Sequence, residues 1–406
     1  MANTLTTIDM VAREALRVAH ESLSYLKTID SSYDSSFAKS GAKIGDTLRV
    51  RNPNQYVRRT GSRVMDVQDQ AETTQNVTVA TQDGVDMKFN SAELLLSIDE
   101  LSRRYIEPAV KVLVAGIEGD VLAAQTKLIP QYTGTKAVVV GASADLNAIT
   151  QARAKLNQQL APKGNRSAQF DSVTMGTISN GIKGIFHKGS ELERSFSEGF
   201  IGRYAGFDLF ENEKTWALTN SSDITANTNA DALVTDGGSS MAVGDDLSAA
   251  NQVVGSIFTC PGVFDCHPET KAAYSHLKQF TVTATGATSF SVSPSTILSG
   301  AKKNMSDAAG ADLAVSVFDE ATLVFYGDAS TTYRQNLVYA KDWATFVTAD
   351  LPIMDDAIRC VRRVQDGLSI RCWQGSDIRN DELLLRLDIL YGNKVLRPEW
   401  ACRVNN

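Results

Sequence analysis

Two long segments of the chain repeat apolar residues at helical spacing. From Asp9 to Leu26 apolar side chains recur three and four positions apart, so the sequence predicts a helix with one buried face. A second helix is predicted from about Ile106 to Lys127, where Glu107 and Pro108 occupy the first turn that such residues favour. At about 1.5 Å per residue, this helix would be about 33 Å long, enough to support a whole domain.

The apolar pattern is interrupted between two predicted strands, Thr47–Val50 and Val77–Ala80. The 26 residues between them, Arg51–Asn76, have only scattered apolar side chains. Connections longer than roughly 12–15 residues are uncommon in compact domains and are usually functional or disordered. We expect this extended loop to be ordered on another copy of the protein, with a flexible surface loop as the alternative. Its basic residues precede its acidic ones: Arg51, Arg58, Arg59, Arg63, then Asp66, Asp69 and Glu72.

Helical and strand patterns are mixed in the segment that follows the loop. Strands are predicted at Gly84–Asn90 and Ala137–Val140, and helices at Asp145–Leu160 and around Gly189–Phe196. This mixture continues to residue 211.

The pattern changes at Asn212 to short alternating strands separated by small and polar residues, and it continues so to about residue 340. Phe280–Thr285 and Ser289–Val292 alternate around a short loop, which predicts a hairpin. Further strands are predicted at Leu313–Phe318 and Thr322–Phe325. Regular strands with turn signals indicate a small barrel or sandwich, so residues 212–340 are expected to be an inserted all-β domain.

After the insertion the chain returns to α/β character and closes with strands, of which Leu383–Leu390 is the most apolar. An insertion flanked by two halves of one body implies that residues 1–211 and 340–406 fold together.

The insertion is acidic, whereas the rest of the chain is neutral. Residues 212–340 hold 6 Lys and Arg against 13 Asp and Glu, which leaves 34 against 34 elsewhere in a chain of net charge −7. Neither part has the basic excess of a protein whose main task is to bind nucleic acid. A mixed-sign body suits surfaces that must contact further copies of themselves without long-range repulsion.

Catalytic signatures are missing from the sequence. The motifs GxSxG, GxGxxG and HExxH and the P-loop do not occur. Cys260, Cys266, His267 and His276 cluster in sequence, but zinc sites favour ligand pairs two to four residues apart, and these two cysteines lie further apart than that. We expect buried, reduced thiols, no metal, no cofactor and no enzymatic activity.

The N-terminal segment does not have the pattern of an export signal. Asp9, Arg13 and Glu14 stand where a signal peptide requires an apolar core. No apolar run approaches the roughly 20 residues that span a bilayer. We therefore expect synthesis in the cytoplasm and no membrane contact.

The order of these parts resembles a tailed-bacteriophage major capsid protein nearly end to end. The chain is most similar to the coat-protein family of short-tailed Salmonella-type phages, which carries a telokin-like insertion domain. Two stretches of the insertion depart from that family's pattern, Gly255-Ser256 and Cys260-Pro261, so its contacts with neighbours carry over least directly. The matching stretches are Ala205-Gly206-Phe207-Asp208, Gly262-Val263, His267-Pro268-Glu269-Thr270-Lys271, Tyr391-Gly392 and Leu396-Arg397-Pro398-Glu399.

The resemblance implies an α+β chain with the tailed-phage/herpesvirus major capsid protein fold and an inserted all-β barrel domain. The implied parts are an N-terminal arm (1–40), an extended loop with flanking strands (41–83), a peripheral domain with a spine helix (84–129), an axial domain (130–211 and 341–370), the inserted barrel (212–340) and C-terminal strands of the peripheral domain (371–406).

The resemblance also implies a function and partners. The chain would assemble into hexamers and pentamers of an icosahedral head around double-stranded DNA, through a scaffold-assisted procapsid that matures. Its partners would be further copies, a scaffolding protein, a portal protein at one vertex and non-specifically held DNA, in a virion made in the host bacterial cytoplasm. The charged loop residues would contact the adjacent subunit, and Asp9, Arg13, Glu14 and Arg17 of the arm would contact neighbours or scaffold. From the residues alone, a carbohydrate- or surface-binding β-module on an α/β scaffold is the alternative.

Overall fold

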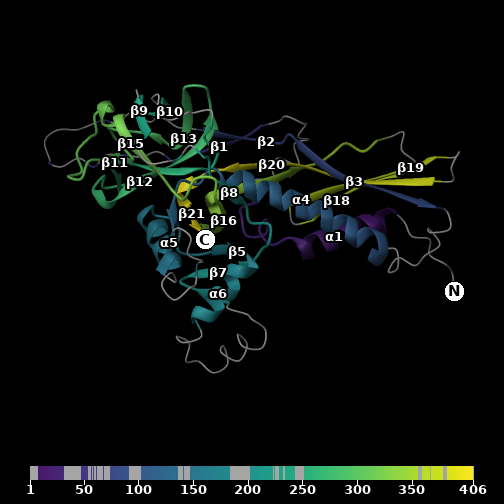
Figure 1. Cartoon of the computed structure of the whole chain (residues 1–406). Coiled ribbons are helices and arrows are strands. Elements are labelled where there is room, and N and C mark those ends of the chain that lie inside the picture. Colours follow the sequence, from purple (N-terminus) through teal and green to yellow (C-terminus); the bar gives the residue numbers. More distant parts are fainter. Residues whose placement is uncertain are drawn as a thin grey trace. The chain divides into compact units, whose positions relative to one another are not determined.

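Two units divide the chain in the structure, a computed structural model (Figure 1). The first comprises the described residues of Met1–Arg51, Thr74–Val121 and Ala344–Leu396, and the second those of Asn52–Thr73, Leu122–Trp343 and Arg397–Asn406. The structure describes residues 8–31, 47–53, 56, 58, 61, 67, 74–90, 102–135, 140, 147–182, 202–222, 224, 228–231, 234–242, 251–354, 359–365, 367–377 and 382–405.

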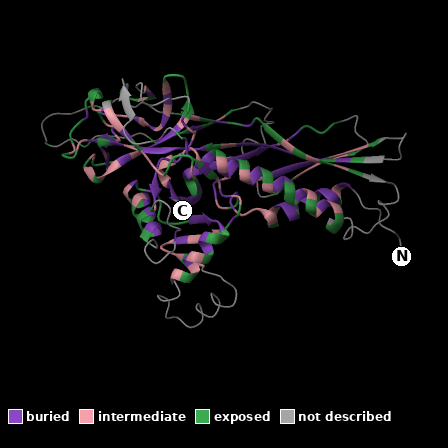
Figure 2. Ribbon diagram, viewed as in Figure 1, coloured by how far each residue is buried: buried purple, intermediate pink, exposed green. Residues whose placement is uncertain are grey.

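An antiparallel sheet of long strands forms the centre of the first unit. On one side β20 pairs with β3. On its other side it pairs first with β19, beyond which lies β18, and then, from Leu390 on, with β17. The period of two sets the faces of β20, because Leu385 and Leu387 are buried whereas Leu384 and Arg386 are exposed. Figure 2 colours the chain by burial. The strands are β3 (Thr81–Asn90), β17 (Ala344–Ala349), β18 (Arg359–Gln365), β19 (Leu368–Asp377) and β20 (Glu382–Val395).

Both predicted long helices are present. α1 (Ile8–Ser22) buries its apolar stripe and contacts β18 and β19 of the sheet. α4 (Glu107–Thr126) follows a π-helical turn, Ser102–Ile106. The fully buried carboxylate of Glu118 accepts hydrogen bonds from the backbone N–H groups of Ser24, at 2.9 Å, and Tyr25, so α4 holds the turn that ends α1. None of the described helices is both long and apolar enough to cross a membrane.

A two-stranded ribbon carries the extended loop. β1 (Thr47–Arg51) and β2 (Thr74–Thr78) pair antiparallel, with Arg51 opposite Thr74 where the loop leaves the ribbon. Val50 and Val77 are buried in one cluster with residues of β17 and β20. The ribbon passes so close to β20 that a Cβ on Gly392 would lie 2.3 Å from the carbonyl oxygen of Thr78. The base of the loop is therefore fixed on the sheet of the first unit.

A second, mixed sheet forms the α/β part of the second unit. Its order is β4-β21-β16-β5-β7-β6, and the start of β16 also pairs with β8. Helices α5 (Asn147–Gln158) and α6 (Ser172–Ile182) share its apolar core, to which Ile149, Phe170 and Val338 belong. The strands are β4 (Tyr132–Thr133), β5 (Arg166–Phe170), β6 (Arg203–Tyr204), β7 (Phe207–Glu211), β8 (Ala217–Thr219), β16 (Thr332–Ala340) and β21 (Ala401–Asn405).

The insertion is an all-β domain around one aromatic core. Its strands pair antiparallel in the order β10-β13-β12-β11-β15-β9, with β14 beside β11. Phe258 stacks on Phe280 at 5.5 Å between ring centroids and meets Phe290 edge-on at 5.6 Å. The strands are β9 (Thr228–Asp231), β10 (Gly238–Ala242), β11 (Ile257–Cys266), β12 (Ala273–Thr285), β13 (Ser289–Thr296), β14 (Met305–Ser306) and β15 (Asp319–Phe325).

One strand prediction in the insertion is wrong. Leu313–Phe318 alternates like a strand, but Val315–Phe318 forms a 3-10 helix in which the N–H of Val317 bonds to the carbonyl of Ala314. The turn places Phe318, which is fully buried, edge-on to Phe280 at 6.4 Å. Core packing therefore overrides the local alternation. The predicted hairpin of β12 and β13 is confirmed, whereas the predicted helix around Gly189–Phe196 lies outside the described residues.

Strand pairing adds detail to the domain limits expected from sequence, whose names and roles stay predictions. β17 and β18, from the segment expected in the axial domain, pair within the sheet of the first unit. β21, from the segment expected in the peripheral domain, pairs with β16 and β4 in the second unit.

Replacing Gly392 by Ala tests the close passage of the ribbon over β20. The added Cβ would lie 2.3 Å from the Thr78 oxygen and 3.0 Å from Val79 Cα, so the ribbon has to shift. We expect the free energy of unfolding of the purified subunit to fall by about 1–3 kcal/mol in urea titrations. Gly375→Ala in β19 is the matched control, because nothing lies within 4 Å of its added Cβ. Equal losses for both variants would show that the passage imposes no constraint.

Candidate functional site

The structure describes only part of the charged loop. Arg51 ends β1, and Arg58 is exposed. Among the other described loop residues, Tyr56 and Val67 are 56% and 79% exposed, so two large apolar side chains face solvent in the single chain. Arg59, Arg63, Asp66, Asp69 and Glu72 lie outside the described residues.

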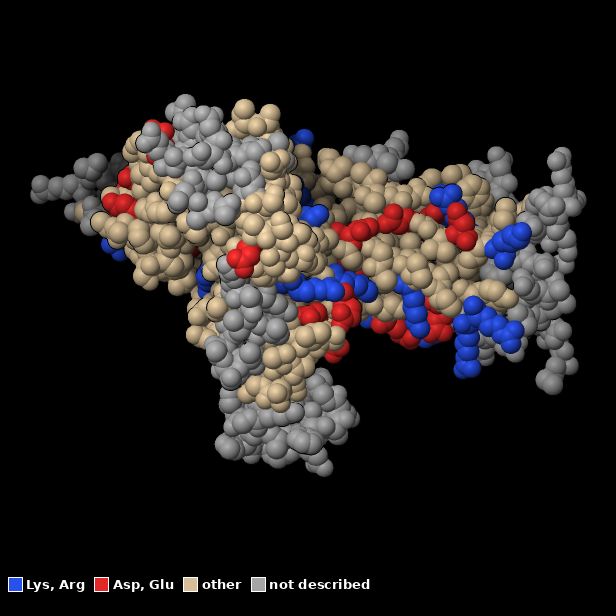
Figure 3. Space-filling view, in the orientation of Figure 1, with Lys and Arg blue, Asp and Glu red and all other residues tan. Residues whose placement is uncertain are grey.

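All four charged residues predicted in the N-terminal arm lie on α1, and each forms an ion pair within the chain. Arg17 contacts Glu14 and Glu21, both at 2.6 Å, and hydrogen bonds to these two carboxylates raise the pKa of Arg17. Asp9 pairs with Arg13 at 3.1 Å and also with Arg363 of β18. The Arg13 side chain is 67% exposed, which makes it the most accessible of these four charged side chains. On the face drawn in Figure 3, basic and acidic side chains lie beside one another.

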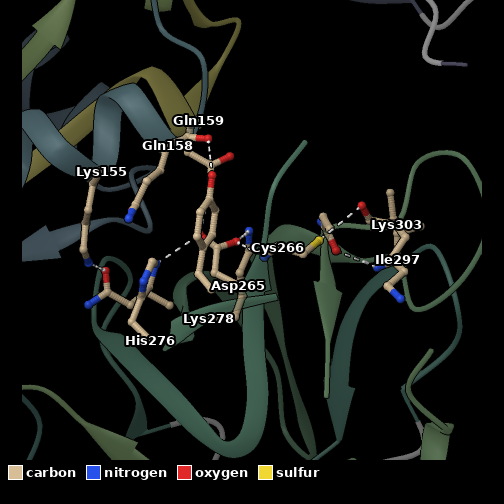
Figure 4. A network of polar contacts seen from close by, with 12 residues as sticks. Lys155, Gln158, Gln159, Asp265, Cys266, His276, Lys278, Ile297 and Lys303 are labelled. Atoms are coloured by element: carbon tan, nitrogen blue, oxygen red, sulfur yellow. Dashed lines mark hydrogen bonds and ion pairs between the residues drawn. The ribbon is translucent and has the colours of Figure 1, made fainter. Parts of the chain in front are cut away.

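A buried ionic cluster, which sequence reasoning missed, joins the insertion to α5 (Figure 4). Asp265 of β11 accepts hydrogen bonds from Lys278 Nζ of β12 at 2.7 Å and from Gln159 Nε2, just after α5, at 2.8 Å. His276 Nε2 lies 3.4 Å from the same carboxylate. We call Gln159, Asp265, His276 and Lys278 the Asp265 cluster. It connects strands of the insertion to the end of α5, through Gln159 and Asp265, which are 106 residues apart in sequence.

The electrostatics of this cluster follow from burial and pairing. Burial alone would raise the pKa of Asp265, but Lys278, assisted by His276, outweighs it and lowers this pKa to about 2. Burial likewise acts to lower the pKa of Lys278, and the Asp265 carboxylate more than offsets it. Both groups are therefore charged at neutral pH, and each is stabilised by the other.

A second polar contact ties α5 to the insertion close by. Lys155 Nζ of α5 donates to the carbonyl oxygen of Tyr132 at 2.7 Å and to the side-chain oxygen of Gln279. Gln279 Oε1 also accepts the N–H of Tyr132, at 2.9 Å. Burial lowers the pKa of Lys155.

A pattern in the sequence could have located the cluster. Lys278 shares its strand face with Phe280 and Val282, both fully buried, so a lysine stands in an apolar series. A buried lysine requires a carboxylate partner. The sequence does not identify that partner as Asp265, because the pairing of β11 with β12 is irregular on either side of Phe264.

The cysteines and histidines that cluster in sequence near Cys260 have other contacts than a metal. His267 Nδ1 accepts the N–H groups of Glu269 and Thr270, each at 3.1 Å, and His276 faces Asp265. Cys260 and Cys266 are buried, and burial raises the pKa of both thiols. Within the described part of the chain, no three His, Cys, Asp or Glu side chains are grouped so that they could hold a metal ion.

Comparison with known proteins identifies the family. The sequence matches the family described as P22 coat protein, gene protein 5, over residues 27–403. No curated protein sequence matches the chain. Similar solved structures include that of Mycobacterium phage Che8, with 9% identity, 94% of this chain and 90% of that chain covered and a TM-score of 0.48. The mature capsid of bacteriophage PhiM1 is similar with 11% identity, 89% of this chain and 82% of that chain covered and a TM-score of 0.40. A virus-like particle from Pyrococcus furiosus is similar with 9% identity, 98% of this chain and 97% of that chain covered and a TM-score of 0.40.

The family match covers nearly the whole chain, including the insertion and the β1–β2 ribbon. By class, the protein is a phage major capsid protein. It belongs to the P22 coat protein family. The family and the α+β capsid fold expected from the sequence are thereby confirmed. A coat protein of this kind is a structural component of a virion and assembles with further copies into a multi-subunit shell.

Replacing Asp265 by Asn tests the buried pair through its pH dependence. Because the pKa of Asp265 in the folded protein, about 2, lies below the ordinary aspartate value of 3.8, the charged carboxylate stabilises the fold above pH 4 and loses this effect as the pH falls to 2. In urea titrations the wild type should lose about 2 kcal/mol more over this interval than D265N does. At pH 7, D265N should be less stable by about 3–5 kcal/mol, because Lys278 is left buried without a partner.

Two further variants separate the pair from general charge loss. D265N/K278M should recover part of the lost stability, because the double variant also removes the buried Lys278 ammonium that D265N leaves without its carboxylate. Asp208→Asn removes an exposed carboxylate 3.5 Å from Arg203, and we expect it to cost less than about 1 kcal/mol. A pH profile of D265N that parallels the wild type between pH 4 and 2 would contradict the assignment.

Proposed function

We propose that this coat protein forms the hexamers and pentamers of an icosahedral phage head that encloses double-stranded DNA. Assembly would proceed through a scaffold-assisted procapsid that then matures. The observation that carries the proposal is the β1–β2 ribbon, because its base is packed on the sheet of the first unit while the loop beyond it has a basic half and an acidic half. Such a loop supports recognition of another copy better than it supports packing on its own chain.

In the proposed contact, the extended loop of one subunit lies on its neighbour. Arg51, Arg58, Arg59 and Arg63 would pair with acidic groups of adjacent copies, and Asp66, Asp69 and Glu72 with basic groups. Tyr56 and Val67, which are exposed in the single chain, would contribute apolar contact area. Each exposed ion pair is worth only about 0–1 kcal/mol, so the shell would depend on many such contacts acting together.

We further propose that the N-terminal arm binds the scaffolding protein and neighbouring subunits through Asp9, Arg13, Glu14 and Arg17. The remaining partners would be a portal protein at one vertex and the packaged DNA, held non-specifically. The protein would be made in the cytoplasm of the bacterial host and would have no membrane partner and no cofactor. The insertion would bridge subunits around the lattice, and the segments before and after it would form the axial and peripheral domains.

Reversing the charges of Arg58, Arg59 and Arg63 to Glu tests the loop contact. Three lost pairs of a few tenths of a kcal/mol each should raise the subunit concentration needed for assembly by about tenfold or more. Light scattering and negative-stain microscopy would measure shell formation, and urea titration would verify that the subunit remains folded. Normal assembly of this triple variant would refute the contact.

A second triple variant tests whether the two halves of the loop pair with each other between copies. Asp66→Lys, Asp69→Lys and Glu72→Lys should weaken assembly similarly, and all six changes together should restore part of it. Lys163→Glu, Lys214→Glu and Lys341→Glu form the control for the arginine triple, with the same change in charge outside the loop. If both triples fail and the sixfold variant also fails, the loop pairs with a different surface of the neighbour.

The arm can be tested with two alanine variants that differ in their contacts within the chain. Arg13→Ala should weaken binding of purified scaffolding protein about threefold and leave the unfolding free energy unchanged, because the side chain is 67% exposed. Asp9→Ala should lower both, because its carboxylate also pairs with Arg363 of the sheet. Calorimetric titration that finds unchanged binding for Arg13→Ala would remove this residue from the proposed contact.

A further inference from the structure

Arg403, three residues before the end of the chain, is completely buried at the junction of three other segments. Its Nη1 donates to the carbonyl oxygen of Gly255 at 2.6 Å. Its Nη2 donates to the Thr281 hydroxyl at 3.0 Å and to the carbonyl oxygen of Lys127 at 3.2 Å. Lys127 directly follows α4, whereas Gly255 and Thr281 belong to the insertion. One side chain therefore bonds to the end of a helix and to two parts of the inserted domain.

The junction has aromatic and backbone components as well. The guanidinium carbon of Arg403 lies 5.9 Å from the ring centroid of Trp216, and Lys127 Nζ lies 5.4 Å from the same centroid. Gly255 has φ +99°, and a Cβ there would lie 2.5 Å from the Trp216 ring, so both the conformation and the space require glycine. The backbone of Trp216 in turn accepts the N–H of Gln335, at the other end of the insertion.

The charge of Arg403 is balanced by dipoles. Burial lowers the pKa of this guanidinium to about 9, and among the described residues its three hydrogen-bond acceptors are two carbonyls and a hydroxyl. The Lys127 carbonyl stands at the C-terminal end of α4, where the helix dipole favours a cation. A buried cation held in this way adds little net stability, but its forked geometry defines one relative placement of the groups that it binds.

We propose that Arg403 is a positioning residue that fixes the insertion on the α/β part of the second unit. The C-terminal strand β21 places the guanidinium, and the guanidinium aligns the end of α4 with Gly255 and Thr281. The position of the insertion thus depends on the pairing of β21 within the sheet. This inference does not depend on the proposed assembly contacts, because every group in it belongs to one chain.

Hydrogen–deuterium exchange of Arg403→Met tests the proposal in the full chain. Methionine keeps much of the apolar volume and removes the donors. Exchange should accelerate about tenfold or more in peptides that contain Gly255 and Val282, whose N–H groups bond to the carbonyls of Val282 and Ser256 beside the groups that Arg403 binds. Peptides from the hairpin near Phe290, inside the insertion core, should keep the wild-type rate. A uniform increase over the whole chain, or no increase, would overturn the proposal, since general destabilisation affects all regions alike.

Three further variants complete the test. Arg397→Met is the matched control, because this C-terminal arginine stacks on Trp400 at 3.9 Å and the same substitution there should leave the junction peptides unchanged. Arg403→Lys keeps the charge without the fork and should give an intermediate rate. If Arg403→Met does not fold, Thr281→Val takes its place in the test. This variant removes one acceptor of Arg403 and should accelerate hydrogen–deuterium exchange in the peptides that contain Gly255 and Val282, by a smaller factor. Wild-type exchange in Thr281→Val would then count against the proposal.

Discussion

The second unit depends on one strand that belongs to two domains. The first residues of β16 pair with β8, where the chain enters and leaves the insertion, and its later residues pair with β5 and β21 in the α/β sheet. An inserted domain joined only by two flexible linkers could rotate freely. Here the exit linker is a continuous strand, so the direction in which the insertion leaves the body is set by the hydrogen bonds of the sheet. The other contacts of the junction act on a domain that is already oriented by this strand.

Buried ion pairs link neighbouring strands in both units, and Gln159 adds a segment distant in sequence to one of them. Asp265 and Lys278 lie against Gln159, and in the first unit Arg371 of β19 bonds to Asp388 of β20 at 2.6 Å, with both side chains almost completely buried. Replacing such groups by apolar ones of the same shape often costs nothing, so stability alone does not explain them. A charge or a fork of donors is satisfied by one arrangement, whereas apolar side chains can pack in several. These pairs therefore define which segments meet and in which register.

The sequence predicted those parts of the fold that depend on local pattern. The two long helices, the flanks of the loop and the β12–β13 hairpin have strong periodicity, and all are present close to the expected limits. The start of the insertion at Asn212 stays a prediction from the change of character there. Pairings such as β16 with β8 and with β5 were not predicted, because strands with similar alternation do not identify their partners. The contacts of Asp265 and Arg403 depend on such pairings and could not be found without them.

In the proposed contact, rigidity at the base of the loop and charge along it would have complementary roles in recognition. Weak exposed ion pairs cannot order a long flexible segment, because each ordered residue costs about 1–2 kcal/mol of backbone entropy. The packing of Val50 and Val77 and the close passage at Gly392 order the base of the loop before any neighbour is present. This lowers the entropy left to be lost on association. If the loop binds a neighbouring copy as proposed, a fixed ribbon with a charged continuation would allow contacts that are individually weak, and hence reversible, to select a partner of the complementary pattern.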